Sequence, residues 1–345
     1  MQKIVKQVAA IDVDHKLLVT TLGRMSDDWT PELYAQKTFD NTKKGFEALL
    51  AWIKKNTVAE VAVRFVMEAT GVYHEQLAYF LDDNNEEVTV VLPNKISNYM
   101  RTLEVKTITD RTASEAIARF GLERKLELWK RPKGIYKKLR QLTRERDQLV
   151  AERTMIKNQL HAEQAEAEPG KSSIARIKAR IKMLDKQEQE IKAELSQLIA
   201  TDAEMKKIIM LLCSLSGIGI LTAAIVLAET NGFEFIRNRR QLASYAGFDV
   251  KEKQSGTSVK GKPKISKKGN KYLRKAMHLP ALSAIRHDER FKGLFVRIVS
   301  KHGIKMKAAV AVQRKLLEMM FTLYKTNTKY DKEYLTKSTV LQTQH

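Results

Sequence analysis

A long apolar repeat in the middle of the chain most constrains its fold. Between residues 174 and 198, apolar side chains recur at alternating spacings of three and four, the heptad pattern of a coiled coil. They are Ile174, Ile177, Ile181, Leu184, Ile191, Leu195 and Leu198, with Glu188 as the one polar interruption. Leu142, Leu149 and Ile156 recur at seven before them, and Pro169-Gly170 separates the two segments. We predict an antiparallel helical hairpin that joins copies of the chain into a dimer or tetramer; the alternative is a solvated spacer.

The sequence before this repeat alternates between strand and helix patterns. The predicted elements are strands Val8–Asp14, Leu17–Leu22 and Gln36–Phe39, a helix marked by Phe46, Leu49, Leu50 and Ile53, a strand Val61–Met67, a helix over 72–82 and a strand Val88–Leu92. The first two strands follow closely enough to form a hairpin. A hairpin-led mixed sheet followed by alternating helices is an α/β layer pattern, and it is the element order of a ribonuclease-H-like (RuvC-like) domain.

The sequence after the repeat is mainly helical. Residues 212–226 have the form of a helix-hairpin-helix element, in which Gly217-Ile218-Gly219 makes the turn between two apolar helices. Such a turn can direct backbone N–H groups at a phosphate without reading sequence, so Gly217 and Gly219 are candidate nucleic-acid contacts; a plain αα-hairpin is equally open. Further helices are predicted over Tyr272–Ile285 and Lys305–Leu323. The expected domains are 1–130 (α/β), 131–205 (arm), 206–325 (basic helical domain) and 326–345 (a loose polar tail).

The charge of the chain is large and unevenly distributed. The formal net charge is +22; residues 1–130 have a net charge of −1 and residues 251–345 a net charge of +17. This asymmetry favours a near-neutral domain joined to one that binds a polyanion, with nucleic acid as the leading partner. An anionic membrane surface is the weaker alternative, because no basic amphipathic helix with Trp or Phe anchors stands out.

Residues 251–275 concentrate this charge, since ten of the twenty-five are Lys or Arg. Gly256, Gly261, Gly269 and Pro263 predict a loop. Its candidate phosphate contacts are Lys260, Lys262, Lys264, Lys267, Lys268, Lys271 and Arg274. Ser255 and Ser258 lie in the same segment, although a loop serine beside glycine is usually a turn residue.

Cys213 is the single cysteine, which excludes a disulfide framework and a cysteine-based zinc site. The N-terminus has no apolar signal core, and no apolar run reaches the length of a membrane span. We therefore expect a cytoplasmic protein with no membrane partner.

Carboxylates lie at strand ends of the first region. Asp12 stands inside the apolar first strand, where burial of a carboxylate is expensive unless a cation or hydrogen bonds compensate it. Asp14 shares its face, Glu68 follows the strand Val61–Met67, and Asp110 is predicted as a helix N-cap. If they converge, their oxygens suit Mg²⁺ or Mn²⁺, and two such ions can cleave a phosphodiester. Taken singly, Asp110 is more typical of a cap and Glu68 of a loop edge.

Several sequence blocks resemble the insertion-sequence "one-ten" family of transposases, which includes the Piv-type DNA invertases. The blocks that resemble its RuvC-like domain are Ala10–Asp14, Met67–Tyr73 and Lys106–Ala116. Those that resemble its C-terminal domain are Leu215–Gly219, Gln241–Gly247, Ser255–Gly261, Ile265–Gly269 and Leu273–Ala276. The resemblance extends over about residues 5–325, in the family's order.

The resemblance implies a DNA recombinase with a composite site. In the family, acidic residues of the RuvC-like domain bind magnesium, and a serine attacks DNA to give a covalent phosphoserine intermediate. Carried over, the metal residues are Asp12, Glu68 and Asp110, and the nucleophile is Ser255, with Ser258 as the runner-up in the same loop. The implied partners are donor and target double-stranded DNA and a structured bridge RNA that guides the enzyme. The resemblance also implies a nucleoid-associated protein of a bacterium or archaeon.

One position departs from the family. A second aspartate usually follows the third acid by three residues, and Ala113 stands there in this chain. Glu115 lies about 140° around a helix from Asp110, so it is a poor substitute, and Asp14 is the preferred fourth ligand. The alternatives are that three carboxylates suffice to bind the metal, or that this enzyme is impaired.

Other readings of the whole chain remain open. A metal-dependent junction nuclease would cut with water and leave no protein–DNA adduct. An invertase would recombine without a guide RNA. A non-enzymatic assembly protein would bind nucleic acid with structural carboxylates, which the apolar setting of Asp12 argues against. The target and donor sequences cannot be read from the chain.

Overall fold

The computed structural model describes residues 3–69, 71–103, 107, 109–234, 236–251, 254–255, 259–260 and 264–333. The chain divides into two compact units, Met1–Arg131 and Pro132–His345. In the described part, no helix is long and apolar enough to cross a membrane.

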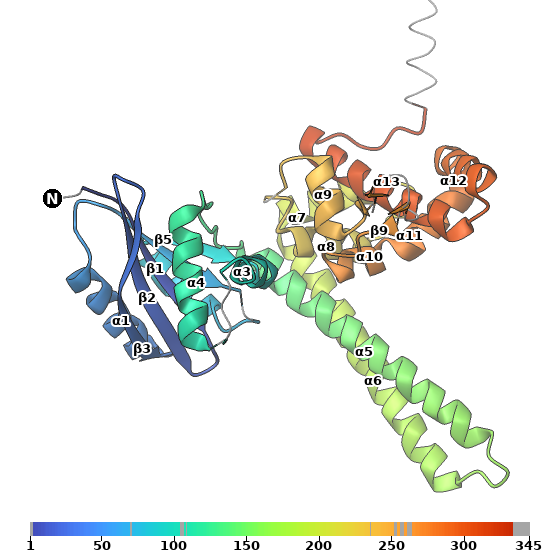
Figure 1. Cartoon of the computed structure of the whole chain (residues 1–345). Helices are drawn as coiled ribbons and strands as arrows, with labels where there is room; N and C mark the ends of the chain where they lie inside the picture. Colours follow the sequence, from blue (N-terminus) through green and yellow to red (C-terminus); the bar gives the residue numbers. More distant parts are fainter. Residues whose placement is uncertain are drawn as a thin grey trace, which may run out of the picture. The chain divides into compact units, whose positions relative to one another are not determined.

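Unit 1 is a mixed sheet with helices on both faces (Figure 1). Its elements are β1 (Ile4–Val13), β2 (Leu17–Ser26), β3 (Pro31–Asp40), α1 (Lys43–Asn56), β4 (Val63–Glu68), α2 (Glu75–Asp83), β5 (Glu87–Val91), α3 (Pro93–Met100) and α4 (Asp110–Glu123). The strand order is β3-β2-β1-β4-β5. Strands β1, β2 and β3 pair antiparallel, and β4 and β5 run parallel to β1. This order fits the predicted α/β domain of ribonuclease-H-like type.

Alternation along β1 assigns its side chains to two cores. Ala9, Ile11 and Val13 pack with α1 and α2, whereas Val8 and Ala10 pack with α4. The even-numbered positions of β1 therefore face α4. This places Asp12, the next residue in that series, on the side of the sheet that α4 covers.

Unit 2 begins with the helical hairpin, formed by α5 (Gly134–Gln164) and α6 (Lys171–Thr201), which run side by side (Figure 1). The predicted seam packs between these two helices, with Ile177, Leu184 and Ile191 all less than 7% exposed. The apolar repeat is thus satisfied within one chain. Assembly of copies through this arm stays a prediction.

Glu188, the polar interruption of the repeat, is buried in this seam. It forms ion pairs with Arg146, Arg153 and Lys192. Burial alone would raise the pKa of Glu188, but the hydrogen bonds from Lys192 and Arg153 and the charge of Arg146 lower it to about 2. The interruption is a charged cluster that fixes the register of the two helices.

The rest of unit 2 is mainly helical. It contains α7 (Ala203–Cys213), α8 (Ile220–Thr230), α9 (Arg239–Ala246), β6 (Val250–Lys251), β7 (Gln254–Ser255), β8 (Val259–Lys260), β9 (Lys264–Ile265), α10 (Lys271–Ala276), α11 (His278–His287), α12 (Glu289–His302) and α13 (Lys305–Thr326). Helices α7 and α8 form the predicted hairpin, and α13 matches the helix predicted over Lys305–Leu323.

Three sequence expectations are corrected here. The single helix predicted over Tyr272–Ile285 is two, because the chain changes from α10 to α11 at Met277. Residues 251–275 are not loop throughout, since β6 pairs with β9 and β7 with β8 before α10 begins. The expected loose tail packs at Tyr330, whose hydroxyl donates to Asp288 and whose N–H donates to Ser214.

Candidate active site

Two neighbouring strands and one helix bring the predicted acids to one edge of the sheet in unit 1. Asp12 lies near the end of β1 and Glu68 ends β4, and the two strands are parallel with Ile11 opposite Met67. Asp110 is the first residue of α4, which packs on the same face of the sheet. All three residues line one cavity of about 610 Å³.

The wall of this cavity includes Ala113 and, from the region of α3, residues that the sequence did not single out. Helix α3 contributes Asn94 and Ser97, its C-cap residue Arg101 lines the cavity as well, and Ala113 lines it from α4. The one signal in the sequence for this wall is Pro93 at the start of α3, a position that favours a helix start. Ala113 therefore faces the cavity at the position where the family usually has its fourth acid.

The two acids proposed to replace that missing carboxylate lie outside the lining. Asp14 follows β1 and is exposed, and its charge contributes to the raised pKa of Asp12. Glu115 accepts a hydrogen bond from the Arg111 guanidinium at 3.2 Å. Within the described residues, no three His, Cys, Asp or Glu side chains are close enough to hold a metal ion as they stand.

Burial, together with the crowding of negative charge, raises the pKa values of two acids of the site. Burial, and then the charges of Asp110, Glu68 and Asp14, raise the pKa of Asp12 to about 6. Burial also raises the pKa of Glu68. Each carboxylate is an oxygen donor of the type that Mg²⁺ prefers, and a cation among them would reverse the repulsion that raises these pKa values. The donor set therefore fits a hard divalent cation.

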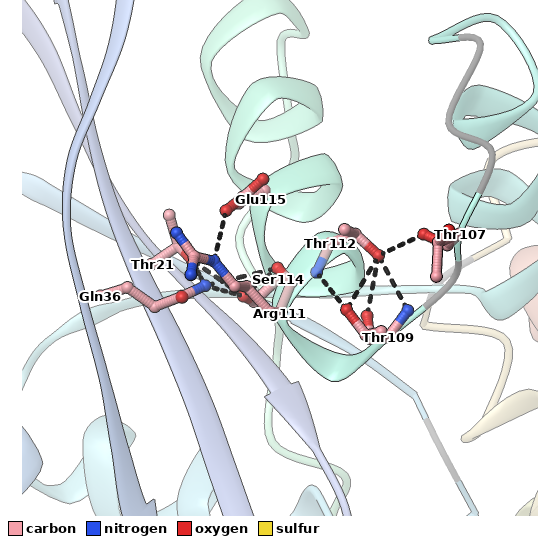
Figure 2. Close-up of polar contacts among 8 residues, drawn as sticks. All are labelled: Thr21, Gln36, Thr107, Thr109, Arg111, Thr112, Ser114 and Glu115. Carbon is pink, nitrogen blue, oxygen red and sulfur yellow. Dashed lines mark hydrogen bonds and ion pairs between the residues drawn. The ribbon is translucent and has the colours of Figure 1, made fainter.

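Helix α4 starts in a well-defined position, which fixes Asp110. The N-cap is Thr109, not Asp110 as predicted; the Thr109 hydroxyl accepts from the Thr112 N–H, and the Thr109 N–H donates to the Thr112 hydroxyl. Thr112 also donates to the Thr107 carbonyl (Figure 2). Asp110 is thus the first helical residue, at the positive end of the helix dipole.

A buried polar cluster ties the same turn of α4 to the sheet (Figure 2). The hydroxyls of Thr21 on β2 and Ser114 on α4 lie 2.8 Å apart, and both residues are buried. The Gln36 amide of β3 donates to each of them, at 2.9 and 3.1 Å. Sequence reasoning missed this cluster, and its only signal was polar side chains at strand positions otherwise occupied by apolar ones.

The basic segment in unit 2 is partly within the described residues. Ser255 lies on β7 with its backbone opposite Val259, and Lys260 lies on β8. Lys264, Lys267, Lys268 and Lys271 are exposed. Ser258 and Lys262 fall outside the described residues. The Arg274 guanidinium donates to the carbonyls of Ala246 and Gly269, so it is engaged within the protein.

Hydrogen bonds and close packing hold the C-terminal end of the basic segment, at Gly269 and Asn270, against α8 and α9. The Asn270 N–H donates to the Tyr245 carbonyl at 2.8 Å. Gly269 has a φ of +150°, and a Cβ there would lie 2.5 Å from the same carbonyl. The carboxylate of Glu229, buried on α8, accepts two bonds from Arg144 of α5 and one from Asn270. Sequence reasoning did not find this buried junction between the arm and the basic segment.

The two turn glycines have different surroundings. Gly217 has a φ of +87°, and a Cβ there would lie 2.4 Å from the Pro280 carbonyl oxygen of α11. Packing against α11 thus accounts for Gly217. Gly219 is the N-cap of α8, and a Cβ there would meet open space.

Comparisons with known sequences agree with these features. Residues 26–164 match the profile of the IS110-type transposases with a DEDD domain, described as a transposase. Residues 210–295 match a profile described as "Transposase IS116/IS110/IS902 family". The two matches together span more than half of the chain, although Asp12 precedes the first of them.

Individual proteins are similar as well. The pilin gene-inverting proteins of Moraxella bovis and Moraxella lacunata are each 29% identical over 304 residues, which cover 86% of this chain and 90% of theirs. An uncharacterised 43.6 kDa protein of insertion element IS110 from Streptomyces coelicolor is 28% identical over 120 residues, 35% of this chain and 29% of that protein. The structure of T. thermophilus RuvC with a Holliday junction substrate matches with a TM-score of 0.27 and 9% identity, over 36% of this chain and 99% of RuvC.

Proposed function

The chain belongs to the IS110 family of transposases and is a DNA recombinase, and we propose that it breaks and rejoins DNA with a metal site in unit 1 and a serine nucleophile in unit 2. The observation that carries the proposal is the carboxylate cavity. Asp12, Glu68 and Asp110 line it together, and burial and the acidic neighbours raise the pKa of Asp12. A carboxylate in this setting is expensive unless it serves a cation.

The metal site would consist of Asp12, Glu68 and Asp110. A bound Mg²⁺ or Mn²⁺ supplies charge for the transferring phosphate and lowers the pKa of an oxygen nucleophile. Asp110 is held by the Thr109 cap and by the nearby Ser114 cluster. Asp14 is the proposed weak fourth ligand. It follows Asp12 by two residues and lies outside the cavity lining, and its charge contributes to the raised pKa of Asp12.

Ser255 is the proposed nucleophile. Its hydroxyl oxygen forms a bond to the phosphorus of a DNA phosphodiester while one phosphorus–oxygen ester bond breaks. The serine gives up its proton, the leaving sugar oxygen gains one, and the DNA end stays on the protein as a phosphoserine. Attack by the freed sugar hydroxyl of a second strand reverses the step and exchanges strands.

The division of labour follows the sequence domains. Residues 1–130 would bind the metal, residues 131–205 would form the assembly arm, and residues 206–325 would present the serine and grip DNA. The acids and the serine lie in different units, so the reaction requires a serine that reaches the carboxylates from the same chain or from another copy. We propose a dimer or tetramer that acts on donor and target duplexes together.

The test is a covalent adduct assay with labelled duplex DNA and Mg²⁺. The Ser255→Ala protein is expected to bind DNA as the wild type does and to form no adduct, whereas Ser258→Ala is the matched control and keeps the adduct. Asp12→Asn is expected to lose the adduct as well. An adduct that survives in Ser255→Ala would place the nucleophile elsewhere.

The same assay separates the rival functions. Metal-dependent cutting without an adduct, unchanged in Ser255→Ala, would identify a nuclease that uses water. DNA binding without any turnover would identify an assembly protein.

A guide RNA is the remaining element of the proposal. It is tested by sequencing the RNA that copurifies with the protein. A single structured species encoded beside the gene supports guided recombination. Only random cellular RNA would favour an invertase that needs no guide.

A further inference from the structure

The first half of α6 has an unusual charge pattern. Residues 171–184 contain five basic residues and no acidic residue. The basic residues, all exposed, are Lys171, Arg176, Lys178, Arg180 and Lys182. Within the described part of the chain, none of the five forms an ion pair. The acids that follow on the helix, Asp185 and Glu188, are already paired with Arg153.

This pattern works against the helix that carries it. Lys171 opens α6 at the positive end of the helix dipole, the Gly170 N-cap has no side-chain bond, and the first turn has no acid. Like charges four residues apart repel at Arg176 with Arg180 and at Lys178 with Lys182. Each such pair destabilises the helix.

In the second half of the same helix, basic residues are paired with an acid. Glu188 compensates Arg146, Arg153 and Lys192 there, so acids stand where stability needs them. The cations near the start of α6 are therefore not explained by the stability of the arm. When several residues on one surface are all unfavourable for the helix that carries them, that surface is expected to have a function.

Three of the cations form a row that we name the lysine stripe: Lys171, Lys178 and Lys182. At 100° per residue they lie within about 40° of one another around the helix, and they span about 17 Å along it. The distal seam packs as its own small cluster of Ile156, Ile177 and Leu184, and the three lysines of the stripe are exposed. The length corresponds to about five base pairs of a DNA strand at 3.4 Å per phosphate.

We propose that the lysine stripe binds the phosphate backbone of duplex DNA at a distance from the cleavage chemistry. Lysine is a point charge suited to backbone contacts that carry no sequence information. Residues 171–186 contain no aromatic residue, so the surface lacks the stacking platforms on which single strands are held. The occupant is therefore duplex DNA, the substrate class of the enzyme, and the arm contributes a non-specific grip on it.

The test compares two triple variants of the full-length protein. Lys171→Gln, Lys178→Gln and Lys182→Gln together neutralise the stripe. Lys43→Gln, Lys44→Gln and Lys55→Gln remove the same charge from exposed positions of α1 and form the matched control. Affinity for a 40-base-pair duplex is measured over a range of salt concentrations, together with the melting temperature.

The stripe variant is expected to bind duplex DNA about tenfold more weakly or worse at low salt. Its log–log salt slope should fall by about 2.7, at about 0.9 per phosphate contact, while the control keeps the wild-type slope. Its melting temperature should be unchanged or higher, because repulsion is relieved. At saturating DNA it should form the same adduct yield as wild type, which separates this surface from the active site.

Three results would overturn the proposal. An unchanged salt slope in the stripe variant would show that these lysines meet no phosphate. An equal loss in the α1 control would show that only total charge matters. A loss confined to single-stranded RNA would exclude duplex DNA as the occupant.

Discussion

The carboxylate cavity makes a quantitative prediction at Asp12. Burial and the neighbouring acids raise the pKa of its carboxyl from 3.8 to about 6. A shift of about two units corresponds to about 3 kcal/mol, which solvent access to the site reduces to about 2 kcal/mol. In the metal-free protein, Asp12→Asn removes a repelled charge and should therefore stabilise unit 1 by about 2 kcal/mol at pH 7.5.

The pH dependence gives this prediction its sign. The folded state binds the Asp12 proton more tightly than the unfolded state does, so ionisation destabilises the fold as pH rises from about 4 to about 6. Below about pH 4 the carboxyl is neutral in both states, and the variant should match the wild type. Above about pH 6 the full difference should be present.

Urea unfolding with a chelator, at pH 4 and pH 7.5, measures both values. Asp27→Asn, at an exposed turn between β2 and β3, is the control and should change neither. Mg²⁺ at ten times its dissociation constant should then stabilise the wild type by about 1.4 kcal/mol and the variant far less. The reasoning fails if Asp12→Asn destabilises the metal-free protein at pH 7.5, or if its effect is the same at both pH values.

Three further perturbations test other parts of the structure. Ser114→Ala should destabilise unit 1 by about 1–3 kcal/mol in urea unfolding, because Thr21 and Gln36 lose a buried partner. The same variant should be stabilised less by Mg²⁺ than the wild type is. Normal stabilisation by Mg²⁺ would show that the cluster does not position Asp110. Glu188→Ala should cost about 3 kcal/mol or more by leaving Arg146 and Arg153 uncompensated. Because the pKa of Glu188 is lowered to about 2, that loss, followed by circular dichroism, should be full above about pH 4.5 and shrink as pH falls toward 2; a constant loss would exclude the ion pairs as its cause. Gly217→Ala should destabilise unit 2 by about 2 kcal/mol or more, because its Cβ would meet the Pro280 carbonyl. The DNA affinity of each folded molecule should be unchanged. Weaker DNA binding at normal stability would indicate that Gly217 binds phosphate.

Periodicity predicted most of the elements that build the fold. The heptad repeat predicted α5 and α6, and strand alternation predicted the sheet of unit 1, because both patterns are set by which side chains must leave water. Short elements with weak patterns were missed. Helix α3 has eight residues and α9 has eight, too few for a periodic signal. The turn at Met277 within Tyr272–Ile285 also left no trace in the apolar pattern.

The acids were found because a carboxylate inside an apolar strand is anomalous by itself. Their supporting partners were not, since Thr21, Gln36 and Ser114 are ordinary residues whose meaning depends on β2, β3 and α4 coming together. Glu229 was missed for the same reason, because its partners Arg144 and Asn270 are 85 and 41 residues away. An anomalous residue at a single position can be recognised from the sequence. A polar network that joins several elements can be recognised only when the fold is known.

The anchoring of the basic segment has a consequence for how such recombinases diverge. Bonds between Asn270 and Tyr245 and between Lys267 and Gly247, together with the pairing of β6 with β9, hold the two ends of residues 252–263 without involving the sequence between them. The entropy of closing a loop grows only slowly with its length, by about 0.6 kcal/mol for each doubling. Insertions or exchanges between these anchors therefore cost the fold little. Natural variation or protein engineering can therefore change the residues between these anchors, and so the molecules that they contact, while the neighbouring helices keep their packing.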